Sequence, residues 1–121
     1  MLNCIAVGLG GFIGSVLRYL AGKIPLPASG GFPASTLAVN VLGSFVIGLL
    51  AALAAKHSGF SPRLLLFLKA GVCGGFTTFS TFSLESFELI RAGACGTAAA
   101  YMLLSAALGV LAAALAMALV K

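Results

Sequence analysis

Four long apolar stretches occupy most of this 121-residue chain, and each is long enough to cross a bilayer as a helix. They run from about 2 to 21, 36 to 55, 64 to 90 and 97 to 120. Only 7% of the residues are charged, against roughly 25% in a typical soluble domain. The sequence therefore predicts an all-α membrane protein, a single domain over residues 1–121 with four transmembrane helices.

Charge and cysteine content exclude several classes of function. The seven basic and two acidic residues give a net charge of +5, and they lie mostly at the ends of the apolar stretches. No basic cluster with interleaved aromatic residues occurs, so nucleic-acid binding is not expected. The three cysteines form no CxxC pair, which leaves a metal cluster or a disulfide framework unsupported. No nucleophile–base pair or set of catalytic carboxylates is visible, and we do not expect an enzyme.

The basic residues are divided between the two ends of the predicted bundle. With four spans, both termini lie on one side of the membrane. That side carries Lys56, Arg63, Lys69 and Lys121, and the other carries Arg18, Lys23 and Arg91. So weak a bias permits insertion in both directions. We therefore hypothesise an antiparallel homodimer of dual topology, which tagged termini found on one side only would rule out.

The run Gly74–Ser83, GGFTTFSTFS, interrupts the third apolar stretch. Glycine loses the most backbone entropy in a helix, and Thr and Ser can hydrogen-bond the local backbone in non-helical conformations. The run therefore predicts a break in the third helix. Inside a bilayer, broken backbone persists only where protein or a water-filled cavity covers it. This makes the run the first candidate for a functional site.

Neutral polar side chains supply most of the chemistry inside the spans. They are Asn40, the Thr and Ser residues of 77–83, Tyr101 and Ser105. Most offer N–H or O–H donors, and the ring edges of Phe79 and Phe82 carry partial positive charge. Donors and ring edges together suit a small anion stripped of water. Simple core packing or lipid contact is the alternative for the two phenylalanines, and an interhelical hydrogen bond is the alternative for Asn40.

Three further features carry structural expectations. Gly10 and Gly14 form a GxxxG motif, which lets helix backbones approach closely. Ser35 or Thr36 is suited to cap the second helix. Glu85 is an acid within a span and so a functional hypothesis. It precedes Arg91 by only about 9 Å of helix, however, so snorkelling or capping of a backbone break competes with a transport role.

Three motifs, in this order, resemble the Fluc/CrcB family of small fluoride channels. They are GGFIGSVLRY at 10–19, STLAVNVLGSFVIG at 35–48 and GVCGGFTTFSTFSLE at 71–85. The last motif is highly specific, and the resemblance covers essentially the whole chain. One departure is Ser35, where the family pattern usually has Gly. The resemblance implies an antiparallel homodimer with two pores, which exports fluoride passively across the bacterial inner membrane and limits its toxicity.

The same resemblance implies roles for individual residues. The implied fluoride-pore residues are Asn40, Phe79, Ser80, Phe82, Ser83, Tyr101 and Ser105. A structural Na⁺ is implied at the dimer centre, held by the backbone carbonyls of Gly74 and Thr77 from both subunits. Arg18 matches the first-helix arginine, and Glu85 matches the acid after the motif. Arg18 and Glu85 are candidates for a structural or vestibule role, and the resemblance assigns no definite role to Glu85.

The main alternative is a small proton-coupled multidrug exporter of dual topology, which also has four short spans. Such an exporter needs an acid deep in a span, and the first apolar stretch has none. The chain also lacks Trp for an aromatic drug site. A non-conducting assembly subunit is the second alternative, and it would leave the polar residues of the spans without a purpose. Fluoride efflux from liposomes without a proton gradient distinguishes the three.

Overall fold

The computed structural model describes residues 1–28 and 30–121, and in this part of the chain it contains helices and no strands. The elements are α1 (Leu2–Ala21), α2 (Ala34–Lys56), α3 (Pro62–Leu65), η1 (Leu66–Cys73), α4 (Gly74–Phe76), α5 (Phe79–Arg91) and α6 (Cys95–Leu119). By length and composition, α1, α2, α6 and the combined segment Pro62–Arg91 are each able to cross a membrane. We call Pro62–Arg91 the third span.

The spans after the first begin two residues earlier than the sequence predicts, at Ala34, Pro62 and Cys95. The expectation that Ser35 or Thr36 caps α2 is wrong. Pro33 occupies the cap position, and both hydroxyl residues lie inside the helix. The proline ring fixes φ near the helical value and so suits a helix start. Thr36 is thereby left to bond to another helix.

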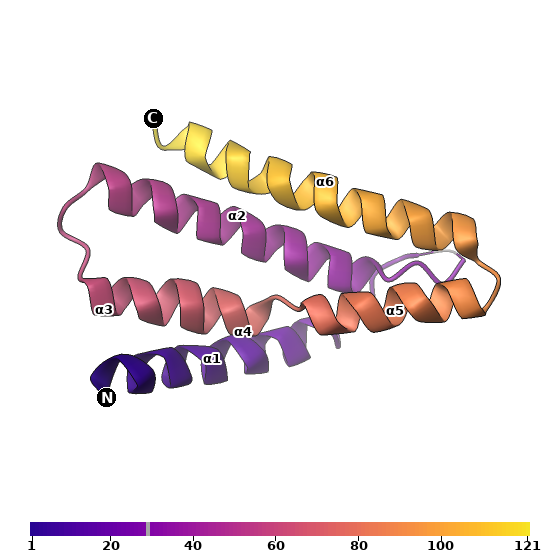
Figure 1. The fold of residues 1–121 in the computed structure, drawn as a ribbon, viewed down its shortest axis with the longest axis horizontal. Coiled ribbons are helices and arrows are strands. Elements are labelled where there is room, and N and C mark those ends of the chain that lie inside the picture. The colour runs from indigo at the N-terminus through magenta and orange to yellow at the C-terminus, as the bar shows by residue number, and fades with distance from the viewer. Residues whose placement is uncertain (29) are drawn as a thin grey trace.

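Two helix pairs make up the bundle (Figure 1). α1 packs along η1 and α4, while α2 packs along α6. Within each pair the chains run in the same direction, and the two pairs run in opposite directions. Both termini therefore lie at one end of the molecule, and α5 continues past the end of α1 to contact α6.

Glycines bring α1 into backbone contact with the third span. A Cβ added to Gly10 would overlap the Phe67 carbonyl oxygen, and one added to Gly14 would overlap the Val72 carbonyl oxygen. From the other side, a Cβ on Gly71 would lie 2.8 Å from Gly10 Cα. No side chain fits between these backbones, so the interpretation of Gly10 and Gly14 as a packing motif is confirmed.

The interior is small, and most large apolar side chains face outward, as a lipid-facing surface requires. Tyr101 is the largest fully buried side chain. Its ring lies between those of Phe32 and Phe82, with centroids 5.6 and 5.2 Å away. On the α2–α6 seam, a Cβ on Gly48 would lie 2.7 Å from the Ala113 carbonyl oxygen. Small residues thus set the spacing of both helix pairs.

The third span changes backbone geometry twice. η1 is π-helical over eight residues, although π geometry usually appears only as a single-turn bulge. α4 then ends at Phe76, and Thr77 and Thr78 have extended backbone with ψ values of 160° and 122°. α5 begins at Phe79, with the Thr78 hydroxyl accepting a hydrogen bond from Thr81 N–H at 3.2 Å. Two extended residues therefore separate the helical halves of this span.

Candidate functional site

Asn40 holds the extended backbone through a pair of hydrogen bonds. Its Nδ2 donates to the Thr78 carbonyl oxygen at 3.0 Å, and Thr78 N–H donates to Asn40 Oδ1 at 2.8 Å. One side chain thus satisfies both backbone polar groups of a residue that lies outside regular helix. The interhelical hydrogen bond considered for Asn40 is therefore present. Because an amide nitrogen carries two hydrogens, one donor of Asn40 is left for a further partner.

A cavity of about 380 Å³ lies beside the two extended residues. Its walls come from α2, from the segment between the end of η1 and the first turn of α5, and from α6. The lining residues are Asn40, Gly43, Ser44, Ile47, Cys73, Gly74, Thr77, Thr78, Phe79, Phe82, Ser105 and Ala106. None of them is charged. Such a wall can donate hydrogen bonds to a small ion. Because the wall carries no opposite charge, it does not hold the ion too tightly for it to leave.

The absence of a side chain at Gly43 brings α2 against the interruption. A Cβ at this position would overlap Thr77 Cγ2. The Thr77 hydroxyl donates to the Cys73 carbonyl oxygen at 2.9 Å, one turn earlier in the span. Likewise, Ser44 Oγ donates to the Asn40 carbonyl oxygen at 2.8 Å. The hydroxyl protons of Thr77 and Ser44 are therefore already engaged.

Ser105 differs from these hydroxyl residues. It lines the cavity from α6, and its Oγ is buried without a hydrogen-bond partner in the described part of the chain. A buried hydroxyl normally has a partner, because leaving one unpaired is unfavourable by about 1–3 kcal/mol. Ser105 is thus a free donor or acceptor at the cavity wall.

Three aromatic rings lead from the cavity into the interior. The Phe79 and Phe82 ring centroids lie 5.6 Å apart at 44°, and those of Phe82 and Tyr101 lie 5.2 Å apart at 53°. Phe79 is 79% exposed, whereas Tyr101 is fully buried. Rings tilted in this way present their positive edges to neighbouring groups rather than stacking face to face.

Glu85 receives two hydroxyl groups at the inner end of these rings. Tyr101 OH donates to Glu85 Oε1 at 3.0 Å, and Thr36 Oγ1 donates to Glu85 Oε2 at 3.1 Å. The carboxylate therefore joins α5 to α2 and α6. It points inward, and the Thr78 backbone groups at the interruption bond to Asn40. In this conformation Glu85 therefore does not cap the interruption.

Of the residues predicted for the site, the cavity brings together Asn40, Gly74, Thr77, Phe79, Phe82 and Ser105. Ser80 and Ser83 lie outside its lining and are exposed on α5. Ser83 Oγ donates to the Phe79 carbonyl oxygen at 2.9 Å, and Ser80 Oγ lies 3.4 Å from Thr78 Oγ1. Tyr101 is outside the lining as well, and its hydroxyl proton is engaged by Glu85.

Arg18 belongs to a second pocket, of about 350 Å³, next to the end of α1. The lining residues are Arg18, Tyr19, Gly22, Lys23, Ser35, Thr36, Val39, Thr78 and Thr81. Arg18 Nε is buried with no hydrogen-bond partner among the described residues. Lys23 Nζ lies 4.9 Å from the Tyr19 ring centroid, a cation–π geometry. Two cations and no acid make this pocket electropositive, and Thr78 lines both pockets.

The sequence alone suggested Thr36 only as a helix cap and Thr78 only as one of the hydroxyl residues of the run 77–83. Thr78 is central because its peptide groups bond to Asn40, and Thr36 because it bonds to Glu85. The signal for Thr78 was available in part, since an amide inside a span requires a polar partner and a broken helix supplies one. Nothing in the sequence paired Thr36 with Glu85, which lies 49 residues away.

The fold and the site together define a small membrane protein of four spans, with an uncharged cavity beside the interruption of its third span. The chain belongs to the CrcB family: residues 5–117 match the family model described as "CrcB-like protein, Camphor Resistance (CrcB)". The family predicted from the three motifs is thereby confirmed. With its four spans, this is a multi-pass membrane protein.

Several relatives are named "Fluoride-specific ion channel FluC". One, from Agrobacterium fabrum strain C58, is 51% identical over 106 residues, which cover 87% of this chain and 85% of the relative. Another, from Methylobacterium sp. strain 4-46, is 43% identical over 121 residues, covering 100% and 98%. A third, from Chlorobium luteolum, is 50% identical over 92 residues, covering 76% and 71%.

Proposed function

We propose that this protein is a fluoride-selective channel through which fluoride leaves the bacterial cell passively across the inner membrane. The observation that carries the proposal is the uncharged cavity beside Thr77 and Thr78, where Asn40 and Ser105 have free hydrogen-bonding capacity. Fluoride holds its water tightly, so a pore must replace those hydrogen bonds with its own. The relatives named as fluoride-specific channels support the same ion.

Three kinds of group at the cavity have unused capacity for fluoride. Asn40 has a second amide hydrogen, Ser105 has an unpaired hydroxyl, and Phe79 and Phe82 offer ring edges. Tyr101 lies next along the line of rings, where Glu85 orients its hydroxyl. We assign these groups to successive positions on the fluoride path. Narrowness and the placement of donors then give the selectivity over larger anions.

An antiparallel homodimer completes this path in our proposal. Phe79 is 79% exposed, and Ser80 and Ser83 are exposed on the same helix. Hydroxyl groups inside a bilayer are normally covered by protein or water, because lipid offers them no partner. A second, inverted copy would cover this surface and close the open side of each cavity, giving two pores. The weak charge bias between the two ends is compatible with both orientations.

A structural Na⁺ at the dimer centre is part of the proposal, and the residues fit it. Gly74 and Thr77 line the cavity, and Thr77 follows the end of α4, where carbonyl oxygens lack helical partners. Carbonyl oxygens suit a hard cation. Two from one chain are too few for such an ion, so a second copy would supply the rest. Bound there, the ion would fix the two interruptions against each other.

The Arg18 pocket is the vestibule of the proposed channel. Its two cations and its hydroxyl groups attract anions, and Thr78 places it directly behind the cavity wall. Opposite charge is absent from its lining. We therefore place Arg18 at a mouth of the path, with its unpaired Nε as a contact for anions.

The proposed channel differs from a proton-coupled exporter in having no acid in the lining of its pockets. Neither Glu85 nor Glu88 lines either of the two pockets. An exporter would need an acid where its substrate binds, so that proton and drug compete for it. The uncharged cavity therefore favours the channel.

Fluoride efflux from proteoliposomes tests this function. We expect the wild-type protein to release fluoride without a proton gradient, and Phe79→Ile or Phe82→Ile to slow efflux by about tenfold or more while dimers still form, because the aliphatic side chain has no positive edge. Phe87→Ile is the matched control, since Phe87 is an exposed residue of α5 that lines neither pocket. Unchanged efflux in both test variants would remove the ring-edge mechanism. Proton-coupled exchange of cationic drugs would establish the exporter instead.

A further inference from the structure

Lys69 is a cation inside the third span that the channel described above does not use. It lies in η1, seven residues after the span begins at Pro62, and its side chain is only half-buried. An ammonium group within a span is unfavourable enough that it usually marks an ion pathway or a specific partner. Lys69 therefore needs either a counter-charge or a function.

Among the described residues, Lys69 has no counter-charge close by. η1 packs against α1, α2 and its own neighbours α3 and α4, and none of these elements contains an acid. Both acids of the chain, Glu85 and Glu88, lie in α5, beyond the interruption. Lys69 Nζ also makes no hydrogen bond within the described part of the chain, whereas Lys56 Nζ donates to the Val120 carbonyl oxygen at 2.8 Å.

The π geometry of η1 places Lys69 on the same face as the cavity. In a π-helix each N–H bonds to the carbonyl five residues earlier, so residues four and five apart share a face. The Gly74 N–H donates to the Lys69 carbonyl oxygen in this way. Cys73 and Gly74, four and five residues after Lys69, both line the cavity. Lys69 therefore stands one helical turn from the cavity wall.

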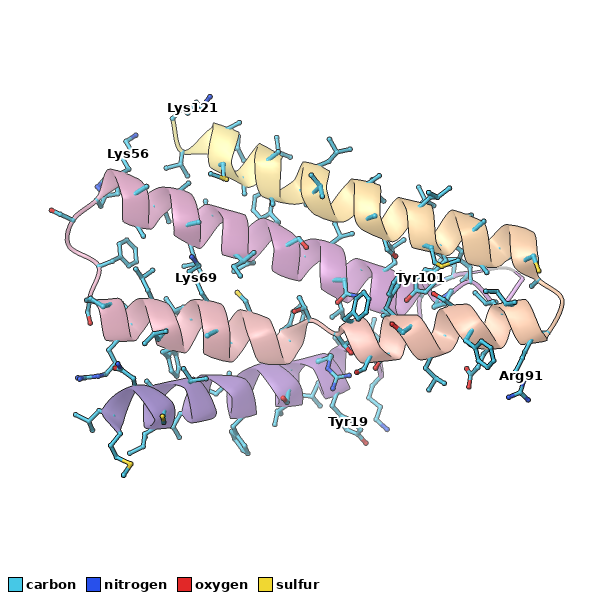
Figure 2. The ribbon with its side chains drawn as sticks, in the orientation of Figure 1. Tyr19, Lys56, Lys69, Arg91, Tyr101 and Lys121 are labelled. Carbon is cyan, nitrogen blue, oxygen red and sulfur yellow. The ribbon has the colours of Figure 1, made fainter. Side chains whose placement is uncertain are left out.

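Figure 2 shows the direction of this side chain. Lys69 projects from η1 toward α2, on the half of the molecule that carries Lys56 and Lys121. α2 also contributes Gly43 and Ile47 to the cavity. The ammonium thus lies between the cavity and the basic end of the bundle, and it is not part of the cavity lining.

We propose that Lys69 guides fluoride between the basic end of the bundle and the cavity. This inference rests on the proposed channel function. A fixed positive charge raises the local concentration of anions within a Debye length, about 8 Å at physiological salt. Because Lys69 lies outside the lining, its charge increases entry into the neutral cavity without adding a strong binding site inside it. Lys69 therefore determines how efficiently dilute fluoride is captured.

The test uses the full-length protein in vesicles of neutral phosphatidylcholine, with efflux measured by a fluoride electrode over a range of fluoride concentrations. We expect Lys69→Met to reduce efflux at low fluoride by about fivefold, while maximal efflux changes by less than about twofold. Lys69→Arg should behave like wild type. An added impermeant salt should shrink the difference between Lys69→Met and wild type, because it screens the charge. Arg91→Met removes one exposed charge at the opposite end of the third span, in neither pocket, and is the matched control that should behave like wild type.

The outcomes separate this inference from the proposed function. Absence of fluoride efflux from the wild-type protein would overturn both. Active wild type with an unchanged concentration dependence in Lys69→Met would overturn the role of Lys69 alone, and so would a Lys69→Arg variant that behaves like Lys69→Met. A defect that occurs only in vesicles containing anionic lipid would assign Lys69 to headgroup phosphate instead. Should Lys69→Met fail to fold, Lys69→Gln carries the same expectation.

Discussion

The two halves of the third span are held in place in different ways. Before the interruption, η1 and α4 press against α1 at glycine contacts, with Gly71 opposite Gly10. After it, α5 is joined to its neighbours by polar side chains, with Glu85 accepting from Thr36 and Tyr101. The first half is positioned by backbone packing, and the second by hydrogen bonds and rings. Substitutions in the first half should therefore destabilise the protein when they add volume at the glycine contacts. Substitutions in the second half should destabilise it when they leave polar groups unpaired.

The largest effect on stability is expected where α1 packs against the first half of the third span, from Gly14→Val. The added Cβ overlaps the Val72 carbonyl oxygen and approaches Phe76 N within 2.8 Å, and both are backbone atoms. Relief requires α1 to move away from both η1 and α4, so we expect the free energy of unfolding to fall by about 3 kcal/mol or more, with little folded protein. Thermal unfolding in detergent, followed by size exclusion, measures it. Gly8→Val is the control, because nothing lies within 4 Å of a Cβ at Gly8. A Gly14→Val protein as stable as the control would contradict the packing account.

The first half of the third span also shows which features could be predicted from the sequence and which could not. Apolar length indicated four spans, and the GxxxG spacing identified the face of α1 that packs. The partner face, including Gly71, could not be assigned, because close approach depends on the relative placement of two helices. The π-helical geometry of η1 was missed as well. Nothing in the order of its residues, LFLKAGVC, distinguishes i+5 from i+4 hydrogen bonding.

An intermediate effect is expected at the interruption itself, from Asn40→Leu. The leucine leaves the Thr78 N–H and carbonyl oxygen without their partners. Unsatisfied buried polar groups are unfavourable by about 1–3 kcal/mol each, so we expect a loss of about 2 kcal/mol or more. Thermal unfolding measures the change in stability, and fluoride efflux measures whether the cavity still conducts. Ser44→Ala is the control: it removes only a bond to the Asn40 carbonyl oxygen, and should be destabilising by less than about 1 kcal/mol.

Asn40→Asp sharpens the same comparison. The aspartate still accepts from Thr78 N–H but cannot donate to the Thr78 carbonyl oxygen when ionised. It also brings a negative charge into a cavity that has none. We expect a loss of stability at least as large as in Asn40→Leu, because an ionised carboxylate inside the span would face the Thr78 carbonyl oxygen. We also expect an equal or greater loss of fluoride efflux, because like charge repels the ion. Efflux at the wild-type rate would show that Asn40 acts on the backbone alone.

The candidate site was predictable by residue type and less so by position. Asn40, the phenylalanines and Ser105 were chosen as donors or ring edges within spans, and all reach the cavity. Ser80 and Ser83 share that chemistry, yet they face outward on α5. Which helix face meets the cavity depends on where α5 begins, and the two extended residues that fix this point have no periodicity to reveal it. The hydrogen bonds of Glu85 to Thr36 and Tyr101 likewise could not be predicted from spacing along the chain.

The smallest effect is expected on the hydrogen-bonded side, from Tyr101→Phe. The ring contacts with Phe32 and Phe82 remain, and Glu85 loses one of its two donors. A single hydrogen bond between membrane helices contributes about 0.6 kcal/mol on average, so the melting temperature should fall only slightly. Tyr19→Phe is the control, since Tyr19 is 63% exposed and its hydroxyl makes no hydrogen bond within the described chain.

Combining Tyr101→Phe with Thr36→Val tests whether Glu85 positions α5 through these two hydroxyl groups. Each single substitution leaves the Glu85 carboxylate one hydroxyl donor, whereas the pair removes both donors that the structure shows. The double variant should therefore lose more stability than the sum of the singles, by about 1 kcal/mol, because a half-buried carboxylate is then left without either donor. A double-mutant cycle by thermal unfolding measures this difference. Additive losses would mean that Glu85 does not depend on these two hydroxyls and that α5 is positioned, like the first half of the span, by packing.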